Sequence, residues 1–303
     1  MNWKDILGEK TGCRLIFNAP MTDYTTYKTG GAAEVLALPE NEEQILRLKT
    51  FCEQKNAPFR MIGLGSNILV SDKGLPGVIC CLKNYVGISI RDEELTALAG
   101  TPLDEAASLS VENGLGGLES LSGIPGSCGG AVYMNAGAFG QETFDNLKCF
   151  KVINADGEIK QFCKNDVEYG YRKVKNIENC IILSATWLLK KQDPAELKQT
   201  RLSVLKRRAE KQPLEYPSAG SVFKRPVNDY ASRLIDVCGL RGLSVGGAKV
   251  SEKHAGFIIN YDNATAADVY ALIRKVQEEV YKKTSVELQT EQILWGDFPG
   301  KTA

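Results

Sequence analysis

Residues 123–140 read GIPGSCGGAVYMNAGAFG, and this glycine-rich stretch decides how we interpret the fold. Nine of the 29 glycines fall between residues 114 and 140. Because glycine has no side chain, successive backbone N–H groups of Gly123–Gly130 can point into one concavity, where a diphosphate fits without steric conflict. The stretch therefore predicts an anion-binding loop, to which the Ser127 hydroxyl adds a donor. Asn135 is placed to bind a ring edge or the loop itself.

A second loop repeats this chemistry at residues 63–67, where GLGSN lies between two short apolar runs. Neither loop has the lysine of a nucleotide-hydrolysing P-loop. Neither opens a long βαβ unit, and Pro125 lies inside the first loop. The two loops together predict a dinucleotide that is held but not hydrolysed. The alternative is that the glycines only punctuate a twisted sheet.

Length and charge limit the classes of protein. A chain of 303 residues predicts about two domains. The 37 basic and 37 acidic residues cancel, so no summed field attracts nucleic acid or an anionic membrane. Residues 1–12 lack the apolar segment of a signal peptide, and the longest uncharged stretch, 120–141, is too rich in glycine to span a membrane. We expect a cytoplasmic protein with no nucleic-acid partner and no membrane insertion.

Histidine and cysteine usage excludes further classes. His254 is the single histidine, which rules out H-E-x-x-H and other multi-histidine metal sites. The nine cysteines are odd in number and contain no C-x-x-C pair, which argues against both a disulfide framework and a zinc site. We therefore expect no metal, and cysteines that are reduced and mostly buried.

Apolar periodicity predicts a mixed α+β fold. Strands are expected at residues 34–38, 60–62, 67–70, 77–82, 87–90, 95–99, 147–153, 158–162, 180–189 and, finally, 285–293. Helices are expected at residues 42–55, after Thr101-Pro102, and at 194–211, 230–238 and 266–283. The last of these opens at Thr265 with Asp268 three residues on, as in a capping box. The pattern changes from mixed to chiefly helical near residue 192, where we place the domain boundary.

Several stretches resemble the family of UDP-N-acetylenolpyruvoylglucosamine reductases. They are TGGAA at 29–33, GLGSNILV at 63–70, the run at 123–140, AGSVFK at 219–224, GGAKVSEKHAGFIIN at 246–260, and Glu291. The resemblance covers nearly the whole chain. It implies an FAD-binding domain of the p-cresol-methylhydroxylase (vanillyl-alcohol-oxidase) type over residues 1–192, with lobes at about 1–82 and 83–192. An α+β substrate-binding domain would follow over residues 193–303.

The resemblance also implies the reaction and its cofactors. NADPH reduces FAD, and the flavin then reduces the enolpyruvyl group of a UDP-sugar, giving UDP-N-acetylmuramate for peptidoglycan. We expect non-covalent FAD, because His254 lies in the other domain. Cys128 is the only cysteine in either loop, and a covalent adduct there is the one alternative that stays open. The residues expected to bind FAD are Gly63, Gly65, Ser66, Asn67, Gly123, Ile124, Pro125, Gly126, Ser127, Gly129, Gly130 and Asn135.

Three residues match the family's catalytic positions. Arg172 has a fork that can bind the substrate carboxylate with two bonds. Ser221 is expected to give the proton to C2 after hydride addition at C3, and Glu291 to orient the carboxylate or assist proton transfer. By pattern alone each has an ordinary alternative: an arginine lying over Tyr171 at the surface, a turn serine, and a carboxylate that meets solvent.

Candidate substrate contacts are Lys211, Lys224, His254 and Asn260. The basic helix around residues 201–211 is most simply a solvated face, from which Lys211 could meet a diphosphate. The interval from Arg172 to Ser221 is 49 residues, which resembles the short subtype without an inserted loop. Two alternatives stay open: another FAD oxidase or dehydrogenase of the same fold, and a non-catalytic protein that binds flavin or nucleotide-sugar.

Overall fold

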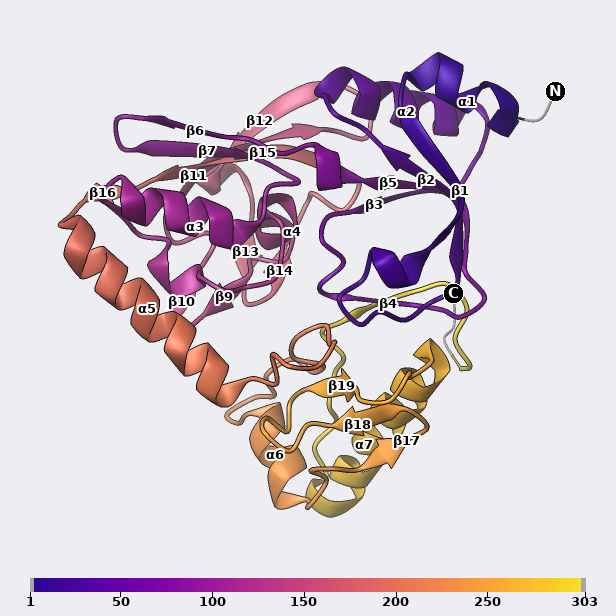
Figure 1. The fold of residues 1–303 in the computed structure, drawn as a ribbon, viewed down its shortest axis with the longest axis vertical. Coiled ribbons are helices and arrows are strands. Elements are labelled where there is room, and N and C mark those ends of the chain that lie inside the picture. Colours follow the sequence, from indigo (N-terminus) through magenta and orange to yellow (C-terminus); the bar gives the residue numbers. More distant parts are fainter. Residues whose placement is uncertain (1–2, 301–303) are drawn as a thin grey trace. The chain divides into compact units, whose positions relative to one another are not determined.

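The computed structural model describes residues 3–300, and the chain forms two compact units (Figure 1). The first unit contains the chain up to Phe17, Val35–Leu64 and Gly77–Arg208. The second contains Asn18–Glu34, Gly65–Pro76 and the chain from Ala209 onward. Each unit is thus assembled from three separate segments. The domain boundary near residue 192, and the two lobes before it, stay predictions.

Two sheets carry most of the first unit. One has the order β1-β2-β5-β3, and the other is the antiparallel sheet β12-β11-β15-β7-β6. Their strands are β1 (Arg14–Pro20), β2 (Ala32–Leu38), β3 (Phe59–Ile62), β5 (Leu75–Cys81), β6 (Ile88–Arg91), β7 (Glu94–Leu98), β11 (Leu147–Ile153), β12 (Ile159–Cys163) and β15 (Ile181–Leu188). Large apolar side chains such as Phe150 and Trp187 are fully buried in this unit's core.

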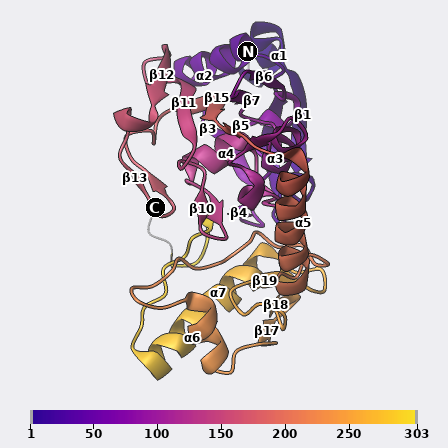
Figure 2. The ribbon, with the colours of Figure 1, turned by 90° about the vertical axis from the view of Figure 1, so that its left-hand side faces the viewer.

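Five α-helices and several short strand pairs complete the described part of the first unit (Figures 1 and 2). The helices are α1 (Trp3–Thr11), α2 (Glu42–Gln54), α3 (Leu103–Glu112), α4 (Cys128–Tyr133) and α5 (Pro194–Lys211). The short strands are β8 (Leu115–Gly116), β9 (Gly137–Ala138), β10 (Gln141–Glu142), β13 (Tyr169–Gly170), β14 (Lys173–Val174) and β16 (Lys190–Lys191). As expected, α5 starts after Asp193, whose carboxylate accepts a hydrogen bond from the Ala195 N–H at 2.7 Å.

The second unit is smaller and is built around one long helix. Its elements are β4 (Ile68–Val70), α6 (Ala231–Val237), β17 (Ser244–Val245), β18 (Ala248–Val250), β19 (Ile258–Asn260), α7 (Ala266–Thr284) and β20 (Ile293–Trp295). Strands β17, β18 and β19 form one sheet, and β20 pairs in parallel with β4. The predicted capping box is confirmed, because the Thr265 and Asp268 side chains each accept from the other's backbone N–H. The buried face of α7 includes Val269, Ile273 and Val276.

The mixed α+β class is confirmed, but three local expectations are wrong. The final strand was expected at residues 285–293, yet β20 begins only at Ile293. Val286 and Leu288 alternate with polar residues, but between α7 and β20 only Thr290 makes a bridge, so no continuous ladder forms. Helix α1 and strand β1 were not expected, and α1 buries only Leu7 and Thr11, which leaves little periodicity to detect.

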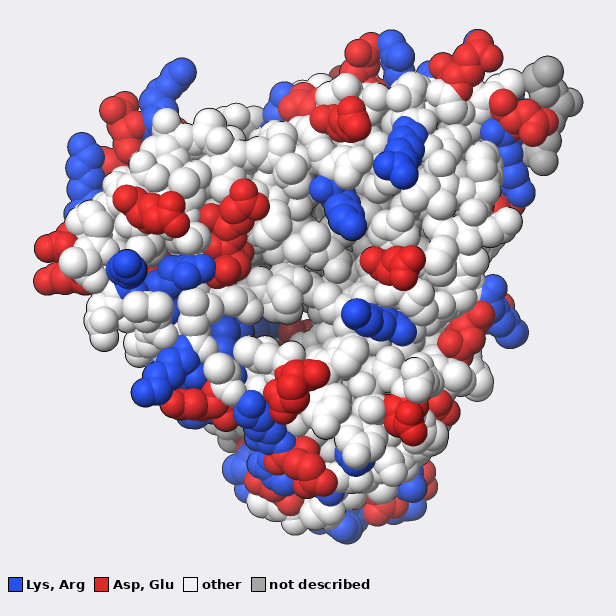
Figure 3. Space-filling model, viewed as in Figure 1, with Lys and Arg blue, Asp and Glu red and all other residues white. Residues whose placement is uncertain are grey.

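Charges of both signs are interspersed on the face shown in Figure 3, in keeping with the formal net charge of zero. Within residues 3–300, no helix combines the length and the apolar character needed to cross a bilayer. The cysteines are free, and seven of the nine are buried, which confirms the expectation of mostly buried thiols.

Candidate functional site

The two glycine-rich loops meet in the first unit at Gly63 and Ser127. A Cβ added to Gly63 would lie 2.1 Å from Ser127 Oγ, so only glycine permits this approach. Ser127 caps α4, and its hydroxyl accepts a hydrogen bond from the Gly130 N–H at 3.2 Å. The hydroxyl was expected only as a donor; here it is also an acceptor.

Loop 123–130 does not form the expected concavity of free N–H donors. The N–H groups of Gly126, Cys128 and Gly129 donate to carbonyls of Ile124, Thr101 and Ala99, at 2.8–2.9 Å. Those of Ile124 and Gly123 donate to the Leu121 carbonyl and the Asp104 carboxylate. Close packing explains the glycines instead: a Cβ on Gly129 would lie 2.7 Å from Ala99 Cβ. The expectation that this loop presents a row of free donors is therefore wrong, because its N–H groups, apart from that of Ser127, are bonded within the chain.

Loop 63–67 has the successive free donors that loop 123–130 lacks. Within residues 3–300, the N–H groups of Gly65, Ser66 and Asn67 donate to no acceptor. Gly65 has a φ of +64°, and a Cβ there would lie 2.1 Å from the Tyr24 carbonyl oxygen. A turn of this kind, with successive free N–H groups and no side chain in the way, fits a diphosphate such as that of FAD.

Basic side chains of α5 hold loop 123–130 in place. Arg201 Nη2 binds both carboxylate oxygens of Asp104, at 2.9 and 3.0 Å, and Asp104 in turn accepts from the Gly123 N–H at 2.8 Å. Arg208 Nε donates to the Ser122 carbonyl at 2.6 Å. Arg208 is only 4% exposed, and burial lowers its pKa to about 10, so it stays charged at neutral pH. The interpretation of this helix as a solvated face is wrong for Arg201 and Arg208.

Arg172 and Asn135 lie together in the first unit. Arg172 has a φ of +53° at the tip of the β13–β14 hairpin, and its Nη2 donates to the Gly137 carbonyl at 2.8 Å. Its guanidinium lies 4.9 Å from the Tyr171 ring centre, as the ordinary interpretation of Arg172 expected. A non-glycine residue in the left-handed region stores about 1–3 kcal/mol of strain, and such residues gather at functional sites.

Asn135 binds the protein rather than offering an edge to a ring. Its side chain is buried, and its amide nitrogen donates to Glu142 Oε2 at 2.7 Å and to the Gly170 carbonyl at 3.1 Å. Its amide oxygen accepts from the Phe144 N–H at 3.1 Å. The side chain of Asn135 thus neither binds the loop itself nor keeps a free edge, as was expected, but binds segments beyond the loop, and its bond to Gly170 supports the hairpin that carries Arg172.

Ser221 and Glu291 lie on neighbouring segments of the second unit. Ser221 is exposed and forms a bridge with Phe257, while the next residue, Val222, accepts from the Glu291 N–H at 2.8 Å. Asn67 joins the same group, because its side-chain amide donates to the Glu291 carbonyl at 3.4 Å. Lys224 is tied to the same strand-like segment through a 2.8 Å bond from its N–H to the Gln289 carbonyl. Arg172 belongs to the first unit.

Gln292 is a residue that sequence reasoning missed. It is 4% exposed, and its side-chain nitrogen donates to the Ala219 carbonyl at 2.9 Å. Its side-chain oxygen accepts from the Tyr27 hydroxyl at 3.1 Å. Gln292 therefore fixes the turn that precedes Ser221. Its partners are 73 and 265 positions away, so no local pattern points to this role.

His254 and Asn260 serve the local scaffold. His254 Nδ1 accepts from the Gly256 N–H at 3.1 Å, and its ring lies edge-on to Phe257. Burial, followed by repulsion from Arg241 and Lys211, holds the pKa of His254 below its usual value, so the ring is neutral at physiological pH. The Asn260 side chain donates to the Tyr27 carbonyl at 3.0 Å and accepts from the Ala264 N–H at 2.8 Å.

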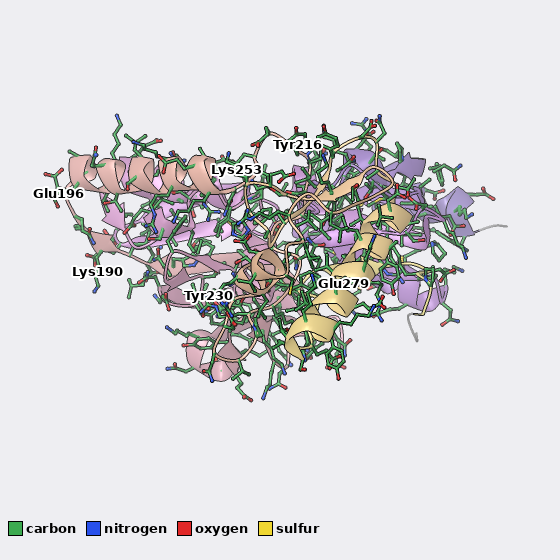
Figure 4. The ribbon with its side chains drawn as sticks, turned by 90° about the horizontal axis from the view of Figure 1, so that it is seen from below. Lys190, Glu196, Tyr216, Tyr230, Lys253 and Glu279 are labelled. Atoms are coloured by element: carbon green, nitrogen blue, oxygen red, sulfur yellow. The ribbon has the colours of Figure 1, made fainter. Side chains whose placement is uncertain are left out.

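Asn260 also lines a cavity of about 500 Å³ within the second unit. Tyr216, labelled in Figure 4, and Tyr261 face each other there with ring centres 5.6 Å apart. Lys28 borders the cavity, and the Lys249 ammonium lies 3.4 Å from the Tyr261 ring centre. Asn260 is the one predicted substrate residue that borders this cavity; Lys211 is exposed on α5.

Two further observations concern cofactors and metals. Cys128 is fully buried, and burial raises the pKa of its thiol to about 12, so it is not a nucleophile at neutral pH. Among residues 3–300, no three histidine, cysteine or acidic side chains are arranged to hold a metal ion.

Comparison with known proteins gives consistent matches along the chain. Residues 33–162 match the model of an FAD binding domain, and residues 212–295 match the UDP-N-acetylenolpyruvoylglucosamine reductase C-terminal domain. The reductase of that name from Enterococcus faecalis is 41% identical over 298 residues, covering 98% of this chain and 99% of that protein. The one from Syntrophomonas wolfei is 43% identical, covering 94% of this chain and 96% of that protein.

A solved structure agrees with the sequence matches. The crystal structure of UDP-N-acetylenolpyruvylglucosamine reductase from Thermus caldophilus is similar to this chain with a TM-score of 0.80 and 35% identity. The similarity covers 94% of this chain and 99% of that one.

Proposed function

Because the chain belongs to the UDP-N-acetylenolpyruvoylglucosamine reductase family of FAD-dependent oxidoreductases, we propose that it reduces UDP-N-acetylglucosamine enolpyruvate to UDP-N-acetylmuramate with electrons from NADPH. The observation that carries the proposal is loop 63–67. Its N–H donors are free, and its Asn67 amide contacts the segment that bears Glu291, which in turn bonds to the chain beside Ser221. The loop that would bind the diphosphate is therefore connected by hydrogen bonds to the segment that carries the candidate proton donor, Ser221.

The residues of loop 63–67 fit the flavin diphosphate, and FAD is bound without a covalent link. Gly65, Ser66 and Asn67 would donate their N–H groups to its phosphate oxygens. Loop 123–130 would give shape and the single free N–H of Ser127 rather than a row of donors, since its other N–H groups are bonded within the chain. When bound, FAD supplies a carrier that accepts a hydride from NADPH and delivers it to C3 of the enolpyruvyl group.

Ser221 would donate the proton that C2 requires. Hydride addition at C3 leaves a strongly basic carbanion at C2, delocalised into the carboxylate, so even a weakly acidic hydroxyl can protonate it. Ser221 is exposed, and its hydroxyl is therefore accessible to a substrate. Lys224, three residues on, would favour the serine alkoxide that proton transfer leaves behind.

Arg172 and Glu291 would handle the substrate carboxylate. The Arg172 guanidinium is already held by backbone carbonyls, and a fixed fork stabilises the charge that develops on the carboxylate more strongly than a flexible cation would. Glu291 would orient the substrate or assist the proton transfer from Ser221. Because UDP-sugars and NADPH are cytoplasmic metabolites, the proposal places the protein in the cytoplasm.

The variant Ser221→Ala separates the two halves of the reaction. Under anaerobic conditions, NADPH should bleach the flavin of Ser221→Ala at nearly the wild-type rate. Reoxidation by the enolpyruvyl sugar nucleotide should slow by roughly 10²- to 10⁴-fold, as for a lost general acid. Ser218→Ala, in the same segment, is the matched control and should reoxidise normally. If both half-reactions of Ser221→Ala slow equally, Ser221 is not the proton donor.

The same two half-reactions, measured on the wild-type protein by stopped-flow absorbance, discriminate the alternatives. A non-catalytic binding protein would take up flavin and sugar nucleotide without bleaching by NADPH. An oxidase or dehydrogenase of the same fold would be bleached by a small alcohol, and the sugar nucleotide would not restore its colour. The proposal requires bleaching by NADPH and recolouring by the sugar nucleotide.

A further inference from the structure

Two cysteines stand directly opposite each other at the edge of the five-stranded sheet. The antiparallel pairing of β11 with β12 places Cys149 across from Cys163, Phe150 across from Phe162, and Lys151 across from Gln161. Residues directly opposite on antiparallel strands project from the same face, so the two thiols share one side of the sheet. Strand β12 is the edge strand, with no further strand beyond it.

The hydrogen-bond pattern shows which kind of pair this is. At the turn, the Asn154 N–H donates to the Glu158 carbonyl at 2.9 Å, so these two residues form a hydrogen-bonded pair. Pairs alternate along an antiparallel ladder, and the pair of Cys149 and Cys163 is five steps further on. It is therefore a non-hydrogen-bonded pair. The bond made by the Cys163 N–H is consistent with this, because it donates to Asp166 Oδ2 at 2.6 Å and not to β11.

A non-hydrogen-bonded pair brings two side chains within reach of a covalent bond. The Cα atoms of such pairs are about 4.5 Å apart, closer than in hydrogen-bonded pairs. Disulfides need Cα atoms roughly 4.4–6.8 Å apart and Cβ atoms roughly 3.5–4.5 Å apart. A pair of this type meets the Cα requirement, so the register of the two strands permits a bond between the sulfurs.

The two thiols also differ in access. All nine cysteines lie in the described residues, and Cys163 is the only exposed one. Cys149 is 7% exposed, and burial raises the pKa of its thiol. A reagent in solution therefore reacts with Cys163 first. Cys149 lies directly opposite on the neighbouring strand and can act as the second thiol.

We propose that Cys149 and Cys163 form a redox-active dithiol that is modified by low-molecular-weight disulfides such as oxidised glutathione. The Cys163 thiolate attacks one sulfur of the reagent, which breaks its S–S bond and releases one reduced thiol. Cys149 then loses its proton and attacks Cys163 Sγ, which expels the second reduced thiol and leaves a Cys149–Cys163 disulfide. The protein loses two protons and two electrons, and the reagent gains both. A reducing dithiol reverses the reaction.

The test uses the full-length, folded protein treated with oxidised glutathione and then alkylated. Wild type should lose two free thiols and the mass of two hydrogen atoms, and peptide mapping should link Cys149 to Cys163. Cys149→Ser should instead keep a stable glutathione adduct on Cys163, because the second thiol is missing. Cys163→Ser should react no faster than the buried cysteines. Dithiothreitol should restore the wild-type thiol count.

The outcomes decide the proposal without reference to the flavin reaction, because every readout is a thiol count or a mass. Wild type that retains glutathione on Cys163 would overturn it, since the second step would then not occur. Linkage of any other pair, such as Cys80 with Cys81, would also overturn it. Cys180→Ser, which removes the only half-buried thiol, is the matched control and should behave as wild type.

Discussion

Gly63 is the residue at which the two glycine-rich loops touch, and its replacement is the sharpest test of that contact. In Gly63→Ala the new Cβ would lie 2.1 Å from Ser127 Oγ and 3.0 Å from Ser127 Cβ, so either the Ser127 side chain, which caps α4, or one of the two loops must shift. Because loop 63–67 holds the free donors, we expect the affinity for FAD to fall at least tenfold, or about 1.4 kcal/mol. Flavin content after purification and a fluorescence titration with FAD measure this.

A glycine-to-alanine change at a position without a clash is the control, because it shows whether the effect of Gly63→Ala comes from the clash with Ser127 or from replacing a glycine. Gly8 lies in α1, and a Cβ there would meet only Leu15, at 3.5 Å. Gly8→Ala should bind FAD normally and gain up to about 1 kcal/mol of stability from helix propensity. Normal flavin content in Gly63→Ala would reject the contact between the loops as a determinant of FAD binding.

His254 gives a prediction on pH. Its pKa is lowered in the folded protein, chiefly by burial, so the unfolded chain binds a proton more readily. Stability therefore falls as the pH drops below about 6.5, the unfolded value, and levels off below the folded pKa. His254→Asn keeps an acceptor for the Gly256 N–H but cannot titrate. Between about pH 7.5 and about pH 5, urea unfolding should show a smaller loss of stability in the variant than in wild type; an equal loss would exclude His254 as the cause.

At this scale, the sequence predicts short-range partners and misses distant ones. Thr265 and Asp268 are three residues apart, and their capping box could be predicted from that spacing. Asp104 and Arg201 are 97 positions apart, so their ion pair has no local pattern. For the same reason, Arg201 had to be interpreted from its neighbours on a basic helix, and that interpretation was wrong.

Helix α5 is the element whose role changes most once the structure is known. Arg201→Gln removes the partner of Asp104, which also holds the Gly123 N–H. We expect loop 123–130 to loosen and FAD affinity to fall by roughly 3- to 10-fold, the effect of about one ordinary hydrogen bond. Lys206→Gln, on an exposed position of the same helix, is the control and should bind FAD as wild type does. Equal affinities in the two variants would contradict the role of the ion pair.

Helix α7 depends on a cap supplied from far along the chain. The Asp72 carboxylate accepts hydrogen bonds from the Ala266 and Ala267 N–H groups, each at 2.8 Å, at the positive end of this 19-residue helix. Asp72→Ala should lower the free energy of unfolding by about 1–2 kcal/mol, as for a lost N-cap. Chemical denaturation measures the loss. Asp72→Asn keeps an acceptor and should lose less; if it loses as much as alanine, the hydrogen bonds are not the cause.

Elements with their own boundary residues could be predicted, and those defined by partners could not. Helices α2, α5 and α7 carry polar caps and apolar faces, and the predicted ranges agree with the structure within a residue or two. Residues 285–292 have the alternation of a strand, but only Thr290 makes a bridge there, to Phe223. A strand exists only where a ladder forms, so alternation alone over-predicted it.

The whole chain is interleaved, and this bears on the predicted domains. The second unit needs Asn18–Glu34 and Gly65–Pro76 as well as the chain from Ala209. Tyr27 and Leu69 are fully buried in that unit's apolar core, where the Tyr27 hydroxyl also donates a hydrogen bond to Gln292. Both segments precede the predicted boundary near residue 192 by more than a hundred residues, so hydrophobic periodicity along the chain does not reveal that they belong there.

A fragment of residues 193–303 tests whether the predicted substrate-binding domain folds by itself. The fragment lacks β4, the partner of β20, and it lacks Asp72, which caps α7. It also lacks Tyr27 and Leu69, and emptying two large core positions typically costs several kcal/mol. That loss is comparable to the whole stability of a small domain, so the fragment should show no cooperative thermal transition by circular dichroism. Full-length protein is the control. A sharp transition in the fragment would mean that residues 193–303 are a domain in their own right, and that the two inserted segments are dispensable for its folding.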